Sequence, residues 1–197
     1  ALHGEPVLMG SLAFRMGSEQ SMHVDPQYIY TEPTGSFAGA WTALEDIHED
    51  SGPFYYYEKS HINPIKVEDV LDNNAGLKQK VMTARLGKTT MRARENWDLA
   101  LDMEKAYLKE LADYWENSGS EKKPALLKKG DTMVWKQWLV HGGLPRKNPK
   151  LTRQSIAYHY CANTCKLWPI ADFFLNSGRL ADIPSQKLSI RQSRYGL

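Results

Sequence analysis

The segment Ser21-Met22-His23-Val24-Asp25 contains an H-x-D triplet, and His141 follows far downstream. Because alternate side chains of a β-strand point to the same face, His23 and Asp25 can reach one point in space. Two imidazoles and one carboxylate on one face of an octahedron form the facial triad that holds non-haem Fe(II) and leaves three positions open. A histidine near an aspartate is common in proteins, so the triplet needs support from the rest of the chain.

Composition sets the outer limits. The chain has 197 residues, which predicts one domain over residues 1–197 with a substantial core. It begins with Ala1 rather than Met, so we expect a fragmentary start that lacks an N-terminal segment. Its 25 basic and 23 acidic residues give a net charge of +2, too balanced to indicate a nucleic-acid or polybasic membrane partner. We find no apolar run of about 18 residues and no signal-peptide pattern, so we expect a cytoplasmic protein whose two cysteines are reduced.

Strand signals dominate both ends of the chain. Residues 7–15 are apolar and predict a core strand, and alternation over Glu19–Asp25 predicts a second strand that carries both candidate ligands. Residues 36–46 and the aromatic run 54–57 are rich in strand formers and flank a Gly52-Pro53 turn, which predicts a hairpin.

The middle of the chain changes period. Residues 66–118 read as a helical insertion, and within 95–117 the residues Trp97, Leu101, Leu108, Leu111 and Trp115 recur at helical spacing. The basic stretch from Lys78 to Arg94 is typical of a solvated face or a mobile loop, and alternatively it attracts an anionic substrate.

Strand character returns over residues 130–141, which places His141 at a strand end before Gly142-Gly143. The next predicted strand, residues 151–161, carries Arg153 and Ser155 on one side. An arginine fork beside a hydroxyl is well suited to hold a carboxylate.

The order of motifs along the chain resembles that of the phytanoyl-CoA dioxygenase family of Fe(II)/2-oxoglutarate oxygenases. The motifs are the H-x-D triplet, Ala40-Trp41-Thr-Ala-Leu44, Gly52-Pro53, Ser60-His61, Gly130-Asp131, His141 and Arg153-x-Ser155. The resemblance spans roughly residues 8–62 and 125–160. It implies a mainly β fold, the double-stranded β-helix or cupin-like jelly roll. It also implies that His23, Asp25 and His141 bind Fe(II), that Arg153 binds the distal carboxylate of 2-oxoglutarate, and that Trp41 lies near this cosubstrate.

The resemblance further implies a dioxygenase that uses O2, hydroxylates a small organic molecule and releases succinate and CO2. Members of this superfamily that halogenate replace the carboxylate ligand with Gly or Ala, so Asp25 favours hydroxylation. The chain departs from the family pattern in its short N-terminal region, at Glu58-Lys59 and at Gly143. These departures affect substrate recognition rather than the iron ligands. Tyr28 and Tyr30 follow the ligands closely and are candidates for the substrate side.

Two alternatives stay open at this point. A cupin-like metal-binding isomerase shares the ligands but does not require the Arg153-x-Ser155 pair. A non-catalytic β-sandwich binding protein could present its tyrosines as a platform and would bind its partner without metal. The sequence does not predict the substrate, the oligomeric state, or roles for His61 and His159.

Overall fold

The computed structural model describes residues 2–33, 35–85 and 96–175. Its strands are β1 Pro6–Phe14, β2 Ile29–Glu32, β3 Phe37–Ala43, β4 Phe54–Tyr57, β5 Lys122–Pro124, β6 Thr132–Lys136, β7 His141–Gly143, β8 Ser155–Ala162 and β9 Lys166–Pro169. Its helices are α1 Val67–Asp72, α2 Ala75–Arg85, α3 Trp97–Asn117 and α4 Ile170–Leu175, with 3-10 turns η1 Asp25–Gln27 and η2 Glu49–Ser51.

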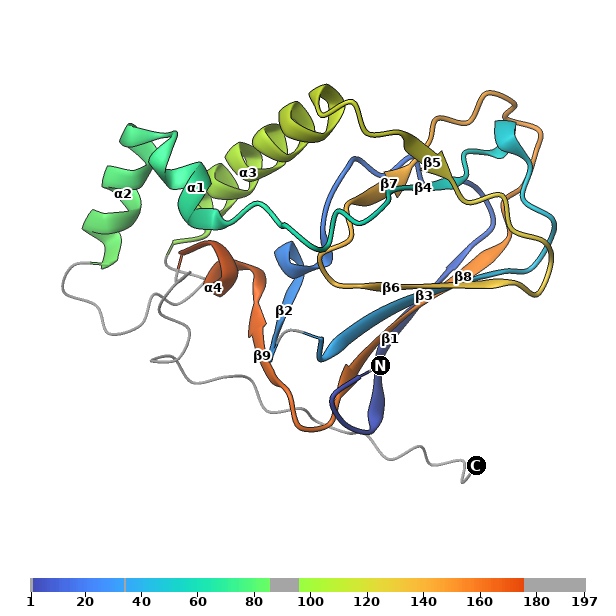
Figure 1. Cartoon of the computed structure of the whole chain (residues 1–197), viewed down its shortest axis with the longest axis horizontal. Coiled ribbons are helices and arrows are strands. Elements are labelled where there is room, and N and C mark those ends of the chain that lie inside the picture. The colour runs from blue at the N-terminus through green and yellow to red at the C-terminus, as the bar shows by residue number, and fades with distance from the viewer. Residues whose placement is uncertain (1, 34, 86–95, 176–197) are drawn as a thin grey trace.

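Two antiparallel sheets form a sandwich (Figure 1). One has the strand order β1-β8-β3-β6 and the other β5-β4-β7, while β2 and β9 form a separate pair. Trp41 on β3 stacks on Phe54 of β4 at 5.7 Å between ring centroids, and Trp135 on β6 lies 5.2 Å from Phe54. Aromatic side chains from both sheets therefore fill the interior between them.

The helices lie at one end of this sandwich (Figure 1). The prediction of a helical insertion is correct, and α3 buries Ala100, Met103, Tyr107 and Leu111 at intervals of three and four residues. The buried face differs from the predicted one, because Trp97 is 46% exposed. The Tyr107 hydroxyl donates to the carbonyl of Ile65 at 3.0 Å, which ties α3 to the chain before α1.

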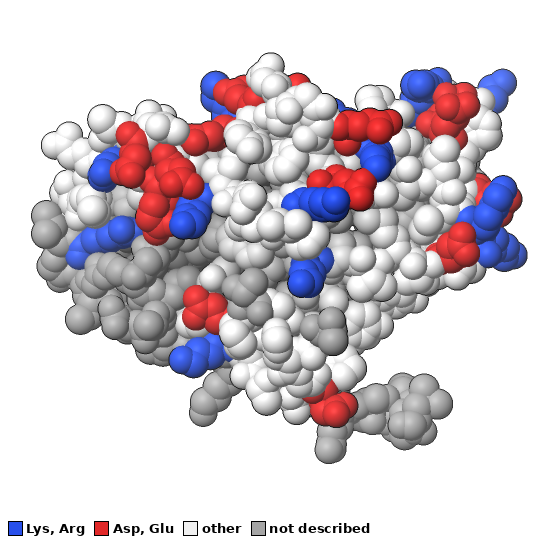
Figure 2. Space-filling view, viewed as in Figure 1, with Lys and Arg blue, Asp and Glu red and all other residues white. Residues whose placement is uncertain are grey.

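The basic stretch is only partly described. On α2, Lys78 pairs with Asp72 at 2.6 Å, and Arg85 donates from Nε to the carbonyl of Leu175 at 2.6 Å. Lys88, Arg92 and Arg94 lie outside the described residues. On the face shown in Figure 2, acidic and basic side chains are intermixed and neither sign forms a broad patch of its own. Across the described residues we find no helix with the length and apolar character that a membrane span requires.

Three predicted strand arrangements are wrong. Residues 19–25 form no named strand: His23 makes an isolated bridge to His141, and Asp25 begins η1. The predicted hairpin of residues 36–57 does not form, because β3 and β4 belong to different sheets. The run 130–141 is not one strand, since a turn closed by the Leu139 N–H on the Lys136 carbonyl separates β6 from β7. In the last two cases the chain crosses between the sheets, which alternation along the sequence does not reveal.

Candidate metal centre

Backbone pairing brings two distant histidines together. The His23 N–H donates to the His141 carbonyl at 2.9 Å, and the His141 N–H donates to the His23 carbonyl at 3.0 Å. The potential ligand atoms of His23, Asp25 and His141 all lie within 4.8 Å of one another. All three residues are buried, at 3–4% exposure. The residues that the sequence predicted as metal ligands therefore form one compact donor set.

Each imidazole is held in a defined tautomer. Nδ1 of His23 lies 2.8 Å from the Ser21 carbonyl, and Nδ1 of His141 lies 2.8 Å from the Leu139 carbonyl. Because a carbonyl can only accept, both Nδ1 atoms carry the proton. The Nε2 lone pairs are then free to bind a metal, which is the usual arrangement of metal-binding histidines.

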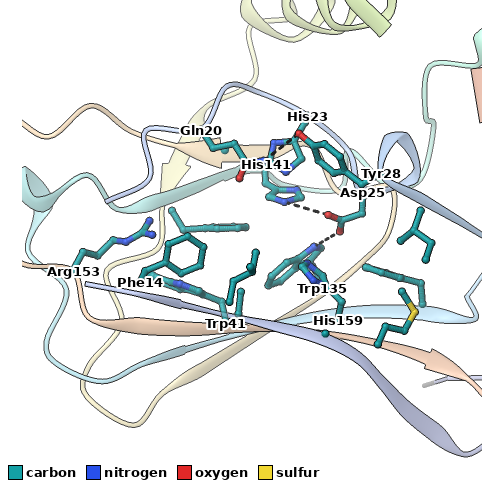
Figure 3. A pocket seen from close by; sticks show the side chains of 18 residues that line it. Phe14, Gln20, His23, Asp25, Tyr28, Trp41, Trp135, His141, Arg153 and His159 are labelled. Atoms are coloured by element: carbon teal, nitrogen blue, oxygen red, sulfur yellow. Dashed lines mark hydrogen bonds and ion pairs between the residues drawn. The ribbon is translucent and has the colours of Figure 1, made fainter. Parts of the chain in front are cut away.

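A tryptophan orients the carboxylate. Trp135 donates from Nε1 to Oδ2 of Asp25 at 2.7 Å, and Oδ1 of Asp25 lies 3.7 Å from Nε2 of His141 (Figure 3). One carboxylate oxygen is therefore fixed by the indole while the other faces the imidazole. Sequence alternation put Trp135 on the face of His141, but nothing in the sequence indicated its bond to Asp25.

Burial shapes the electrostatics of the set. Desolvation, assisted by the nearby His141, lowers the pKa of His23 to about 3, and desolvation lowers the pKa of His141 to about 4. Desolvation also raises the pKa of Asp25. The imidazoles are therefore neutral near pH 7, as metal ligation requires, and a bound divalent cation would favour the ionised form of Asp25.

The three ligands line a cavity of about 430 Å³ that also contains Arg153. Figure 3 shows the ligands grouped together, with Arg153, Phe14 and Trp41 at a distance from them. The Arg153 guanidinium carbon lies 5.3 Å from the ring centroids of both Phe14 and Trp41. The guanidinium thus packs against two aromatic rings and lines the cavity.

Arg153 is a buried cation without a described counter-ion. It is 2% exposed, and burial lowers its pKa to about 10. Nη1 donates to the carbonyl of Gly52 at 3.2 Å, whereas the buried Nε has no hydrogen-bond partner among the described residues. A buried guanidinium with an unsatisfied N–H fits an anionic ligand, and a carboxylate matches its fork geometry.

The remaining predicted residues separate into two groups. Trp41 and Tyr28 line the cavity. The hydroxyl of Ser155 donates instead to the Arg153 carbonyl at 3.3 Å, and Ser155 does not line the cavity. Tyr30 also does not line it, because its ring packs against Trp138, Trp168 and Phe173. Tyr30, which was expected on the substrate side, is therefore not among the residues that line this cavity. The sequence missed Phe14 and assigned no role to His159, both of which line the cavity.

Residues 12–155, more than half of the chain, match the family model of phytanoyl-CoA dioxygenase (PhyH). The chain belongs to the phytanoyl-CoA dioxygenase family. Phytanoyl-CoA dioxygenase domain-containing protein 1 of Danio rerio is 37% identical to it over 46 residues, which are 23% of this chain and 16% of that protein. The Bos taurus protein of the same name is 40% identical over 45 residues, again 23% of this chain and 16% of the relative. These alignments cover only a short part of either relative.

Solved structures confirm the fold. The non-heme alpha-ketoglutarate-dependent carbocyclase SnoK from nogalamycin biosynthesis superposes with a TM-score of 0.56 at 13% identity, over 95% of this chain and 61% of SnoK. The epimerase SnoN in complex with Fe3+, alpha-ketoglutarate and nogalamycin RO gives a TM-score of 0.51 at 16% identity, over 87% of this chain and 56% of SnoN. The chain thus spans about three fifths of the length of SnoK and slightly less of the length of SnoN. The predicted double-stranded β-helix fold is correct.

Proposed function

We propose that this protein is an Fe(II)- and 2-oxoglutarate-dependent dioxygenase that hydroxylates a small organic molecule and releases succinate and CO2. One observation carries the proposal: the buried ligand set and the buried Arg153 with its unpaired Nε line the same cavity. A ligand that binds metal at one end and carries a carboxylate at the other can occupy the metal-ligand set and pair with Arg153 at the same time.

The residues have separate tasks in this proposal. His23, Asp25 and His141 hold the metal through Nε2, one carboxylate oxygen and Nε2. Arg153 binds the distal carboxylate of 2-oxoglutarate, and the rings of Phe14 and Trp41 exclude water from that ion pair, which strengthens it. Bound Fe(II) and 2-oxoglutarate supply the activation of O2, while the protein orients the substrate carbon and keeps the site dry.

Two rival functions make different demands on these residues. A cupin-like metal-binding isomerase has no need for a buried arginine that lacks a carboxylate partner. A β-sandwich that only binds another molecule has no need for three converging buried ligands. SnoK and SnoN are described as a carbocyclase and an epimerase, so product analysis must distinguish hydroxylation from ring closure and epimerisation.

The first test is anaerobic titration of the Fe(II)-loaded protein with 2-oxoglutarate, followed by the visible charge-transfer band of the chelate. We expect the band with the native protein. In Arg153→Met the dissociation constant should rise at least about thirtyfold, because losing one partner of a buried charge pair costs about 2–5 kcal/mol. Arg146→Met is the matched control, since Arg146 pairs with Glu19 at 2.9 Å and does not line the cavity.

Three results would contradict the proposal. Bound iron without a band on addition of 2-oxoglutarate would favour the isomerase. Equal 2-oxoglutarate affinity of the native protein and Arg153→Met would remove the role of Arg153. If the native protein bound no iron, and His23→Ala behaved like the native protein in the same iron titration, a non-catalytic binding protein would be favoured.

A further inference from the structure

We infer that the part of the cavity around His159 is the substrate subsite, and that it takes a neutral, largely apolar molecule whose hydroxyl or carbonyl group hydrogen-bonds to His159. This inference rests on the proposed function, because it assigns the Arg153 end of the cavity to the cosubstrate.

β8 and the two residues before it separate the two ends of the cavity. Arg153, Ala157 and His159 all line the cavity. They are four and two residues apart, and these even spacings place them on one face of extended chain. Arg153 and His159 are separated by roughly 20 Å at about 3.3 Å per residue. Ala157 pairs with Trp41, and His159 pairs with Gly39 further along β3. A ligand bound at Arg153 therefore leaves the His159 end of the strand free.

Contacts place His159 beside Trp135, close to the ligand set and apart from Arg153. Its ring lies 6.5 Å from Trp135, edge to face, and Trp135 is the residue that hydrogen-bonds Asp25. Figure 3 shows His159 beside Trp135 and below Asp25, with Arg153 on the opposite side of the view. A molecule held at His159 thus lies next to the proposed metal and outside the cosubstrate position.

The His159 ring is oriented and has hydrogen-bonding capacity to spare. It stacks on Phe37 at 5.7 Å and 30° between ring planes, which fixes the plane of the imidazole. Among the described residues neither ring nitrogen has a hydrogen-bond partner, and the side chain is only partly buried. An imidazole N–H donates and an unprotonated ring nitrogen accepts, so a histidine side chain can meet either a hydroxyl or a carbonyl of a ligand.

The surrounding wall is apolar and carries little charge. Met9, Leu12, Ile29 and Phe37 line the cavity, and Leu12 is 54% exposed, as expected at a cavity mouth. Arg153 is the one arginine or lysine among the described lining residues. With Arg153 assigned to the cosubstrate, this part of the cavity offers a polyanionic substrate no counter-charge, whereas an apolar molecule with one polar group matches the wall.

The test uses three related probes of one ring system: 2-naphthol, naphthalene and 2-naphthalenesulfonate. Dissociation constants are measured by ligand-observed NMR on the protein loaded with Zn(II) and 2-oxoglutarate, which prevents turnover. We expect 2-naphthol to bind about three- to tenfold more tightly than naphthalene, the size of one net hydrogen bond, and the sulfonate to bind most weakly.

Variants isolate the histidine. His159→Phe keeps a ring on Phe37 and should abolish the advantage of 2-naphthol over naphthalene, while His159→Gln should retain part of it. Tyr158→Phe is the control, since Tyr158 does not line the cavity, and it should behave like the native protein. The affinity for 2-oxoglutarate should be the same in all four proteins.

The subsite assignment is overturned if 2-naphthol does not bind, if it binds no better than naphthalene, if His159→Phe keeps the difference, or if the sulfonate binds best. Failure of the proposed function is a separate result, because the native protein would then not bind 2-oxoglutarate before any probe is added.

Discussion

Replacing Trp135 with phenylalanine tests how the metal centre is built. The indole donates to Oδ2 of Asp25 at 2.7 Å inside the protein, and Trp135 itself is 6% exposed. Phenylalanine retains a ring against Phe54 and His141, which lie 5.2 and 5.3 Å from the indole, but has no N–H. The substitution therefore removes the hydrogen bond while keeping much of the packing.

The size of the effect follows from the kind of bond. A hydrogen bond to a charged group contributes about 1.5–3 kcal/mol, and removing partners that orient metal ligands costs about 10–100-fold in metal affinity. We expect Trp135→Phe to raise the dissociation constant for Fe(II), or for Mn(II) as its air-stable substitute, by about 10–100-fold. Calorimetric titration of the metal-free protein measures this directly.

Trp138→Phe is the matched control. Trp138 is a partly buried tryptophan whose ring lies 6.2 Å from Tyr30 and 5.9 Å from Phe173, within the hydrophobic cluster that α3 and α4 share. It should lose a comparable amount of packing and leave metal affinity unchanged. A folded Trp135→Phe protein that binds metal within threefold of the native value would refute the reasoning, because Asp25 would then be positioned without its indole partner.

Three further substitutions probe the neighbourhood. In the absence of 2-oxoglutarate, Arg153→Met should leave the free energy of unfolding in urea equal or higher, because a buried charge without a carboxylate partner is removed; a loss above about 1 kcal/mol would contradict this. Gly39→Ala places a Cβ 2.2 Å from Cε2 of Trp135. It should lower the free energy of unfolding by about 1–3 kcal/mol or more and weaken metal binding. A melting temperature and a metal affinity equal to those of the native protein would show that the indole can move freely. Ser60→Ala leaves the Val140 N–H, now 2.8 Å from the Ser60 hydroxyl, without its partner and should lower thermal stability by about 1–3 kcal/mol; an unchanged midpoint would argue against this bond.

The ligand set was predictable because it depends on residue type and order. His23, Asp25 and His141 converge as the H-x-D pattern and the family resemblance implied. The backbone conformation that brings these side chains together was not predictable. Alternation suggested a strand through His23 and Asp25, whereas the structure has a single bridge followed by a 3-10 turn. The sequence predicted which residues supply the ligand atoms, but it did not predict the backbone conformation that brings them together.

The crossing between sheets explains the other errors. Counting back by twos from His141 puts Leu139, Gln137, Trp135 and Met133 on one face, and no Gly or Pro between residues 131 and 141 marks the turn after Lys136. That turn sends β6 and β7 to opposite sheets, and Trp135 reaches Asp25 across the space between them. A partner set by tertiary packing leaves no local signal.

The buried face of α3 has a similar explanation. The helix carries apolar residues on more than one side, and periodicity alone favoured a stripe that includes Trp97. Contacts with α1, α2 and α4 select the stripe through Met103 and Tyr107 instead. The existence of the helix follows from the sequence, and its orientation follows from its neighbours.

The pairing of β4 with β5 determines where the helical insertion joins the sheet. Tyr57 pairs with Lys122, so the chain leaves the sheet and re-enters it at adjacent positions, and residues 58–121 are the loop of one very long hairpin. On its other edge β4 pairs with β7, where Tyr56 lies opposite His141. The strand pairing that positions His141 therefore lies on the edge of β4 away from β5, and Ser60 at the start of the loop supports it by accepting from the Val140 N–H at 2.8 Å. The helices also share a core with Val24 and Val140, the neighbours of the ligands, so a helical layer of another length or sequence would have to keep that packing.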